Sequence, residues 1–138
     1  MKTIEQIKSG KNYTAVNVGR MNEIIEHELP MGPDMVIKGK VFVGQAVGAT
    51  GSEFSFQTLV PGQDSGFLHT HKTHEELYFI LKGEGQYQVD GEIFPVSEGS
   101  VVRVAPEASV RSRTPAPRTW SCCASSTRQA PLPRPTAR

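Results

Sequence analysis

The feature of this chain that most constrains its fold is a series of short apolar runs divided by glycine and proline turns. Between residues 34 and 106 these runs read MVIKGKVFVG, EFSFQTLV, GFLHTH, ELYFILK, QYQV, EIFPV and SVVRVAP. Their β-branched and aromatic residues favour strands, and no helical stretch separates one run from the next. Strands connected in this way pair antiparallel, so we expect an all-β domain built as a sandwich or barrel.

Local turn chemistry refines this expectation. Asp90-Gly91 is the strongest hairpin signal in the chain, because both positions of a two-residue turn of this type need a positive φ. Pro95 lies inside a run and cannot donate a ladder hydrogen bond, so its strand should be an edge strand or end in a bulge. Residues 1–33 contain one short helix candidate, TIEQIKSG, and then a Pro- and Gly-broken segment, and we expect them to form an N-terminal arm.

Length and charge restrict the class of protein. A chain of 138 residues suits one domain with one hydrophobic core. No run approaches the roughly 18 apolar residues of a membrane span, and the polar start MKTIEQIKSG is unlike a secretion signal, so we expect a cytoplasmic protein with no membrane partner. Residues 1–108 carry a net charge of about −5 and residues 109–138 about +6. Because the predicted domain is acidic and only Trp120 accompanies the later arginines, we expect no nucleic-acid partner.

Three of the four histidines lie within HTHKTHEE, residues 69–76. Strand side chains alternate between faces, so His69 and His71 point the same way and can hold one ion between them. Glu76 opens the next run, which must pair back against the histidine strand, and its carboxylate can supply a third ligand. Two imidazoles and one carboxylate suit a divalent ion such as Fe, Mn, Zn or Ni and leave coordination positions open. The sequence therefore predicts a metal site at these three residues.

Neighbouring residues leave alternatives open. His74 lies within the tight turn and is a weaker candidate ligand. Glu75 is the rival of Glu76, because a slip of one residue in the turn exchanges the carboxylate that faces inward. If Glu76 faces the site, the apolar residues that alternate with it in ELYFILK, which are Leu77, Phe79 and Leu81, should face away and pack between sheets. His27, alone in IIEHELP, is expected to be structural or exposed to solvent.

The histidine region resembles the first signature of the cupins. The stretch PGQDSGFLHTHKTHEELYFILKG has the same order of a Pro-Gly turn, His-x-His, four residues, Glu, six residues and Gly. Here the signature falls on His69, His71, Glu76 and Gly83, with six rather than five residues between Gly62 and His69. The stretch DGEIFPVSEGSVVRVAPE is similar to the second cupin signature as far as its last proline.

This resemblance implies a double-stranded β-helix, a small antiparallel barrel with a metal inside its mouth. It also implies a fourth ligand, usually a histidine a few residues beyond the position of Pro106. The chain has no histidine after His74, and Gln57 is only a remote candidate for that place. We therefore expect a three-ligand site with water in the remaining positions, as catalytic metal sites have.

Two functions fit a metal in such a barrel. The first is an enzyme that acts on a small organic molecule, a dioxygenase or an isomerase among cupin-like reactions, with Tyr78 as an acid or a substrate contact. The second is a non-enzymatic binding or sensor module in which the metal is structural or absent. In either case Phe54, Phe56, Tyr78 and Ile80 would line a pocket for a small molecule. Small cupins often pair through their sheets, so the resemblance also implies a homodimer.

The composition changes after residue 108, which divides the chain into a cupin-like domain at 1–108, with its core at about 34–108, and a tail at 109–138. Arg, Pro, Ser, Thr and Ala make up 24 of these last 30 residues. We expect the tail to be irregular, to contain no central strand and to add nothing to the site, because prolines break strand ladders. One interpretation is a frameshifted reading of the last strands, since one permitted set of shifted codons turns residues 114–126 into NTGTEDLELLCIQ. The alternative is a disordered linker.

Overall fold

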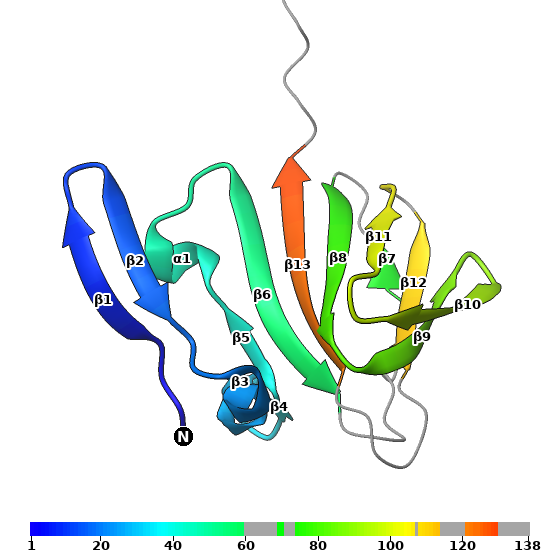
Figure 1. Cartoon of the computed structure of the whole chain (residues 1–138), viewed down its shortest axis with the longest axis horizontal. Coiled ribbons are helices and arrows are strands. Elements are labelled where there is room, and N and C mark those ends of the chain that lie inside the picture. The colour runs from blue at the N-terminus through cyan, green and yellow to red at the C-terminus, as the bar shows by residue number, and fades with distance from the viewer. Residues whose placement is uncertain (60–68, 71–73, 107, 114–120, 130–138) are drawn as a thin grey trace, which may run out of the picture.

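The chain folds into facing β-sheets with an N-terminal layer against one of them (Figure 1). The computed structural model describes residues 1–59, 69–70, 74–106, 108–113 and 121–129. Within these residues, the β9 sheet has the strand order β10-β9-β12-β7 and the β8 sheet has the order β11-β8-β13-β6-β5. Neighbouring strands in both sheets are antiparallel. The all-β prediction is confirmed.

The order of the elements follows the runs seen in the sequence. The strands of the β9 sheet are β7 (His69–Thr70), β9 (Glu84–Val89), β10 (Glu92–Ser97) and β12 (Ser109–Arg113). Those of the β8 sheet are β5 (Lys40–Phe42), β6 (Ser52–Leu59), β8 (His74–Lys82), β11 (Val101–Val104) and β13 (Ser121–Gln129). The N-terminal layer consists of β1 (Glu5–Gly10), β2 (Tyr13–Asn17), η1 (Met21–Glu26), β3 (Glu28–Pro30), β4 (Val36–Lys38) and α1 (Gly44–Val47).

The main hydrophobic core lies between the two sheets. Its buried members from the β8 sheet are Tyr78, Ile80 and Val104, and those from the β9 sheet are Tyr87, Val96 and Val110. Side chains of β8 alternate, since Glu76, Tyr78 and Ile80 are buried whereas Phe79 and Leu81 are each 38% exposed. Phe79 and Leu81 therefore face away from Glu76 as predicted, but the prediction that they pack between sheets is wrong. They lie on the outer face of the β8 sheet.

The hairpin between β9 and β10 confirms the Asp90-Gly91 turn. Asp90 and Gly91 have φ angles of 48° and 84°, and the strands pair from Val89 and Glu92 onward. The Asp90 Oδ1 atom also accepts a hydrogen bond of 2.9 Å from the backbone N–H of Ser109, which ties the turn to β12. Strand β10 ends the β9 sheet, so the expected edge position of Pro95 is confirmed as well.

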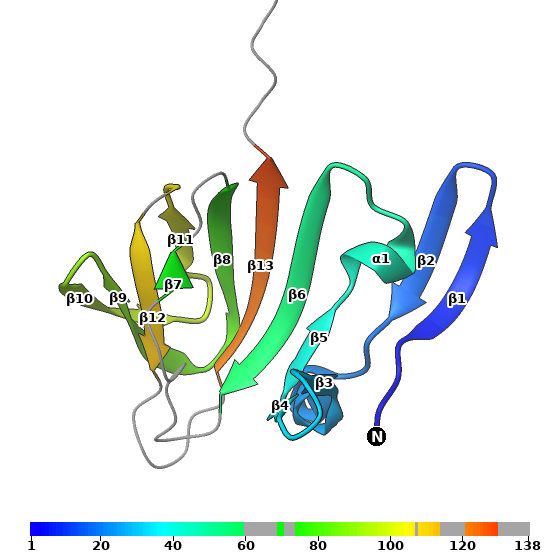
Figure 2. The ribbon, with the colours of Figure 1, turned by 180° about the vertical axis from the view of Figure 1, so that it is seen from behind.

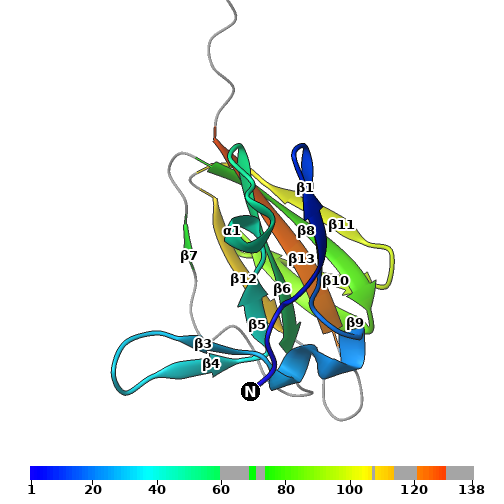
Figure 3. The ribbon, with the colours of Figure 1, turned by 90° about the vertical axis from the view of Figure 1, so that its left-hand side faces the viewer.

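The N-terminal layer differs from the arm that the sequence predicted. The expected helix at TIEQIKSG is wrong, because residues 5–10 form β1 and pair with β2. Eight residues are too few to hold a helix without packing, whereas the hairpin satisfies their backbone groups in pairs. This hairpin lies at the end of the molecule opposite β10 (Figure 2). The β3–β4 hairpin projects from the body of the molecule (Figure 3).

A second core joins this layer to the outer face of β6. Val18, Ile24 and Val43 are its buried members, and Phe54 and Phe56 pack against them. His27 is buried beside this core and its Nε2–H donates to the carbonyl oxygen of Val18 at 2.7 Å. The structural role expected for His27 is therefore confirmed. No helix in the described part of the chain is long and apolar enough to cross a membrane.

The last strands correct the prediction for the tail. Residues 109–113 form β12, and residues 121–129 form β13, which pairs with β8 on one side and with β6 on the other. The expectation that the tail is irregular and contains no central strand is wrong for these two segments. The physical reason is that the prolines flank the strands: Pro117 precedes β13 and Pro131 follows it. Every residue of β13 keeps its backbone donor for the ladder.

Candidate metal site

Strand β8 carries the predicted carboxylate ligand to the interior. Glu76 is 6% exposed and lies opposite the buried Val104 of β11. Tyr78, two residues further along the same face, is 8% exposed, and its hydroxyl donates a hydrogen bond to the Glu76 Oε2 atom. A carboxylate held between the sheets in this way is an oxygen donor that faces the core rather than bulk solvent.

The rival carboxylate faces the other way. Glu75 lies on the outer face of the β8 sheet, where its Oε2 atom accepts a hydrogen bond of 2.8 Å from the Nε atom of Arg103. The two side chains are 37% and 59% exposed, so this is a surface ion pair. The alternative in which Glu75 replaces Glu76 at the interior is wrong, because the alternation within β8 fixes which of the two is buried.

The histidines are described in part. His69 begins β7, and its backbone lies opposite Val110, which is buried in the main core. Antiparallel partners share a face of the sheet, so position 69 belongs to the row that contains Val110. His74 begins β8 with its backbone opposite Gln129, and His71 lies outside the described residues. Among the residues that the structure describes, no three His, Cys, Asp or Glu side chains gather at one point.

The lining of the interior differs from the prediction. Phe54 and Phe56 contact each other with ring centroids 5.7 Å apart on the outer face of β6, so their expected place in the pocket is wrong. The interior positions of β6 are Ser55 and Gln57. Strand β13 lies between β6 and β8 and pairs with both. Through this pairing Ser55 is aligned with Tyr78, and Gln57 is aligned with Ile80. The alternation in SEFSFQTL places the two phenylalanines on one face of β6 and Ser55 and Gln57 on the other. It does not tell which face points inward.

The hydrogen bond between Tyr78 and Glu76 was not predicted from the sequence. The signal that could have found it is the spacing, because residues two apart in a strand lie on one face. The Tyr78 ring is packed edge-on against Tyr87 of the β9 sheet, with centroids 5.2 Å apart and planes at 68°. Both sheets therefore contribute to the position of the Tyr78 hydroxyl.

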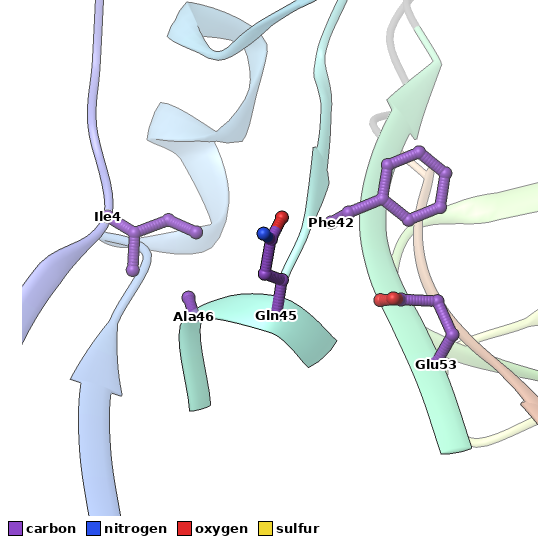
Figure 4. A pocket seen from close by; sticks show the side chains of 5 residues that line it. All are labelled: Ile4, Phe42, Gln45, Ala46 and Glu53. Atoms are coloured by element: carbon purple, nitrogen blue, oxygen red, sulfur yellow. The ribbon is translucent and has the colours of Figure 1, made fainter. Parts of the chain in front are cut away.

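A surface hollow of about 580 Å³ lies away from these residues, where α1 meets β5 and β6 (Figure 4). It is lined by Ile4, Phe42, Gln45, Ala46 and Glu53. The Glu53 Oε1 atom accepts hydrogen bonds from the backbone N–H groups of Gly44 and Phe54 at 3.0 and 3.1 Å, so this carboxylate holds the start of α1. The hollow contains none of the predicted ligands, and the interior of the two sheets is the better candidate site.

Comparison with known proteins identifies the fold family. Residues 55–114 match the family model of the cupin domain. A cupin protein from Bacteroides fragilis has a similar structure, with a TM-score of 0.65 and 25% identity, and the match covers 88% of this chain and 87% of that protein. Residues 55–114 are therefore identified as a cupin domain, and the chain has the double-stranded β-helix fold of the cupins.

Two further relatives extend the comparison. The uncharacterized protein MJ1618 of Methanocaldococcus jannaschii is 37% identical over 51 residues, which are 37% of this chain and 41% of that protein. The match thus spans less than half of the relative's length. A protein from Acidithiobacillus ferrooxidans whose name proposes a sugar phosphate isomerase has a TM-score of 0.57 at 23% identity, covering 64% of this chain and 58% of its own. This last likeness concerns the fold.

Proposed function

We propose that this chain is a metal-binding cupin that acts on a small organic molecule at a divalent ion held by His69, His71 and Glu76. The observation that carries the proposal is the burial of Glu76 on the interior face of β8, with Glu75 turned outward to Arg103. Of the two adjacent carboxylates, only Glu76, which occupies the signature position, faces the core. The register of β7, which sets position 69 opposite the buried Val110, supports the same site.

The chemistry of the donor set fits a divalent transition metal. Two imidazole nitrogens and one carboxylate are the ligands that Fe, Mn, Zn and Ni accept, and three protein ligands leave room for water or substrate. Such an ion supplies a Lewis acid that polarises an oxygen atom of the bound molecule. The apolar side chains of Val102 and Val104, which lie opposite Tyr78 and Glu76, would keep bulk water from the site.

The reaction class is either a dioxygenase or an isomerase. The relative from Acidithiobacillus ferrooxidans, whose name proposes a sugar phosphate isomerase, makes isomerisation of small phosphorylated sugars the first reaction to assay. A non-enzymatic binding or sensor module is the second candidate function. The observation that favours it is the missing fourth ligand, since the sequence contains no histidine after His74.

Metal content of paired variants tests the proposed ligands. Glu76→Gln and His71→Ala should lose the ion, because each removes one of three donors, whereas Glu75→Gln and His74→Ala should retain it. Each control changes a nearby residue of the same type. The control and the ligand variant should therefore differ little from each other in folding and net charge. Retention of metal by Glu76→Gln together with its loss from Glu75→Gln would contradict the proposal.

We also propose that the chain forms a homodimer through the outer face of the β8 sheet. Phe79 and Leu81 are each 38% exposed and Val101, opposite Phe79, is 59% exposed, so an apolar surface runs across β8 and β11. On the same face the N-terminal layer covers Phe54 and Phe56 of β6. The N-terminal layer thus covers the β6 side of this face and leaves the apolar surface on β8 and β11 exposed. An exposed apolar surface is typical of an interface, and the same surface of a second copy can pack against it about a twofold axis.

A further inference from the structure

We infer that Tyr78 is a positioning residue that fixes the Glu76 carboxylate for metal binding. The inference rests on the proposed metal site and goes beyond it, because it assigns a role to a side chain that does not itself bind the ion. Its basis is the hydrogen bond from the Tyr78 hydroxyl to the Glu76 Oε2 atom, formed between two buried residues on one face of β8.

Strand geometry makes this bond a local consequence of the sequence. Residues 76 and 78 lie about 6.6 Å apart along the strand and project to the same side. A tyrosine side chain is long enough to reach back over that distance to a glutamate carboxylate. Because Oε2 accepts the tyrosine proton, the carboxylate of Glu76 is tied to a ring that is itself fixed by packing. The bond thereby favours one orientation of the carboxylate.

The hydroxyl is itself held by packing from both sheets. The Tyr78 ring is 8% exposed and makes its edge-on contact with Tyr87 of β9 at 5.2 Å. Val102 lies opposite Tyr78 on β11. A free glutamate side chain loses rotamer freedom when it binds an ion, and a donor fixed in advance reduces that entropic cost.

The arrangement also separates positioning from acid catalysis. A tyrosine hydroxyl carries one proton, and in this structure that proton is donated to Glu76. Tyr78 thus acts through the carboxylate, in the way that outer partners of metal ligands orient the ligand and raise its affinity. The role of Tyr78 as an acid or a substrate contact stays a prediction, whereas the contact that the structure shows is with Glu76.

Titration of the full chain with Co²⁺ after removal of bound metal tests the inference. The visible absorption of Co²⁺ reports both affinity and ligand geometry. We expect Tyr78→Phe to weaken Co²⁺ binding by about 10- to 100-fold, the usual effect of losing an outer hydrogen-bond partner, and to shift the absorption bands. Tyr87→Phe removes the same single oxygen atom from the neighbouring ring and should leave both affinity and bands unchanged.

The outcomes distinguish this inference from the proposed function. Wild-type affinity and bands in Tyr78→Phe, with Glu76→Gln unable to bind, would overturn the role of Tyr78 and leave the metal site intact. A lower thermal midpoint in both Tyr variants without any change in Co²⁺ binding would reduce Tyr78 to a packing residue and would also overturn the inference. Failure of the wild-type chain to bind Co²⁺ would overturn the metal site and the inference together.

Discussion

At the scale of single residues, the buried polar groups differ in whether they have a hydrogen-bond partner. Glu76 and Tyr78 satisfy each other inside the fold, and His27 donates to Val18. Thr58 differs, because its hydroxyl is buried and has no hydrogen-bond partner in the described part of the chain. A buried hydroxyl without a partner costs stability, so replacing Thr58 by an apolar residue of the same shape should stabilise the fold.

We expect Thr58→Val to raise the free energy of unfolding by about 1 kcal/mol, because it removes the unpaired hydroxyl and keeps the branched shape. Thr58→Ser is the matched control, since it keeps the hydroxyl and removes the methyl group, and it should lower the free energy of unfolding by about 1 kcal/mol. Urea denaturation measures both. Destabilisation by the valine variant would show that the hydroxyl has a partner after all.

At the scale of elements, the β9–β10 hairpin depends on one backbone angle. Gly91 has a φ of 84°, and a Cβ atom added there would meet nothing within 4 Å, so any cost of a side chain comes from the backbone alone. We expect Gly91→Ala to lower the free energy of unfolding by about 1 kcal/mol. Gly51→Ala is the control, because its surroundings are equally open and its φ is not in the left-handed region. Equal effects in thermal or urea denaturation would contradict this reading of the turn.

The elements also show what the sequence could and could not predict. The strands from residue 52 to residue 104 were predictable because alternation and turn chemistry are local signals. The direction in which β6 faces was not, because Phe54 and Phe56 are buried by an N-terminal layer distant in sequence. The choice between Glu75 and Glu76 likewise depends on the register of β8, which a slip of one residue would reverse.

Strand β13 was missed for a different reason. Its sequence SCCASSTRQ lacks the strong apolar alternation of the other strands, and it occupies the central place between β8 and β6 only through pairing on both sides. The frameshift interpretation of residues 109–138 stays a prediction. Under the frameshift interpretation, leucine would occupy position 123 and isoleucine position 125. These positions pair with Ile80 and Tyr78 of β8. Resequencing the gene, or the intact mass of the purified protein, decides it.

For the whole molecule, the proposed dimer rests on the outer face of the β8 sheet, which the N-terminal layer covers over β6 only. We expect the chain to elute as a dimer, and Phe79→Asp to give a monomer, because a charge at the centre of an apolar interface is costly to bury. Ile93→Asp is the control, since Ile93 is equally apolar and 65% exposed but lies on β10 of the other sheet. Light scattering after size exclusion gives the mass, and a monomeric wild-type chain would contradict the proposed interface.

We propose that the interior of this cupin fold holds a divalent metal ion at His69, His71 and Glu76. Elemental analysis of the protein purified without chelators measures whether the ion is there. We expect close to one transition-metal ion per chain, since three protein ligands form a single site. A folded wild-type chain that carries no transition metal, and takes none up when Fe²⁺, Mn²⁺, Zn²⁺ or Ni²⁺ is supplied, would contradict the claim.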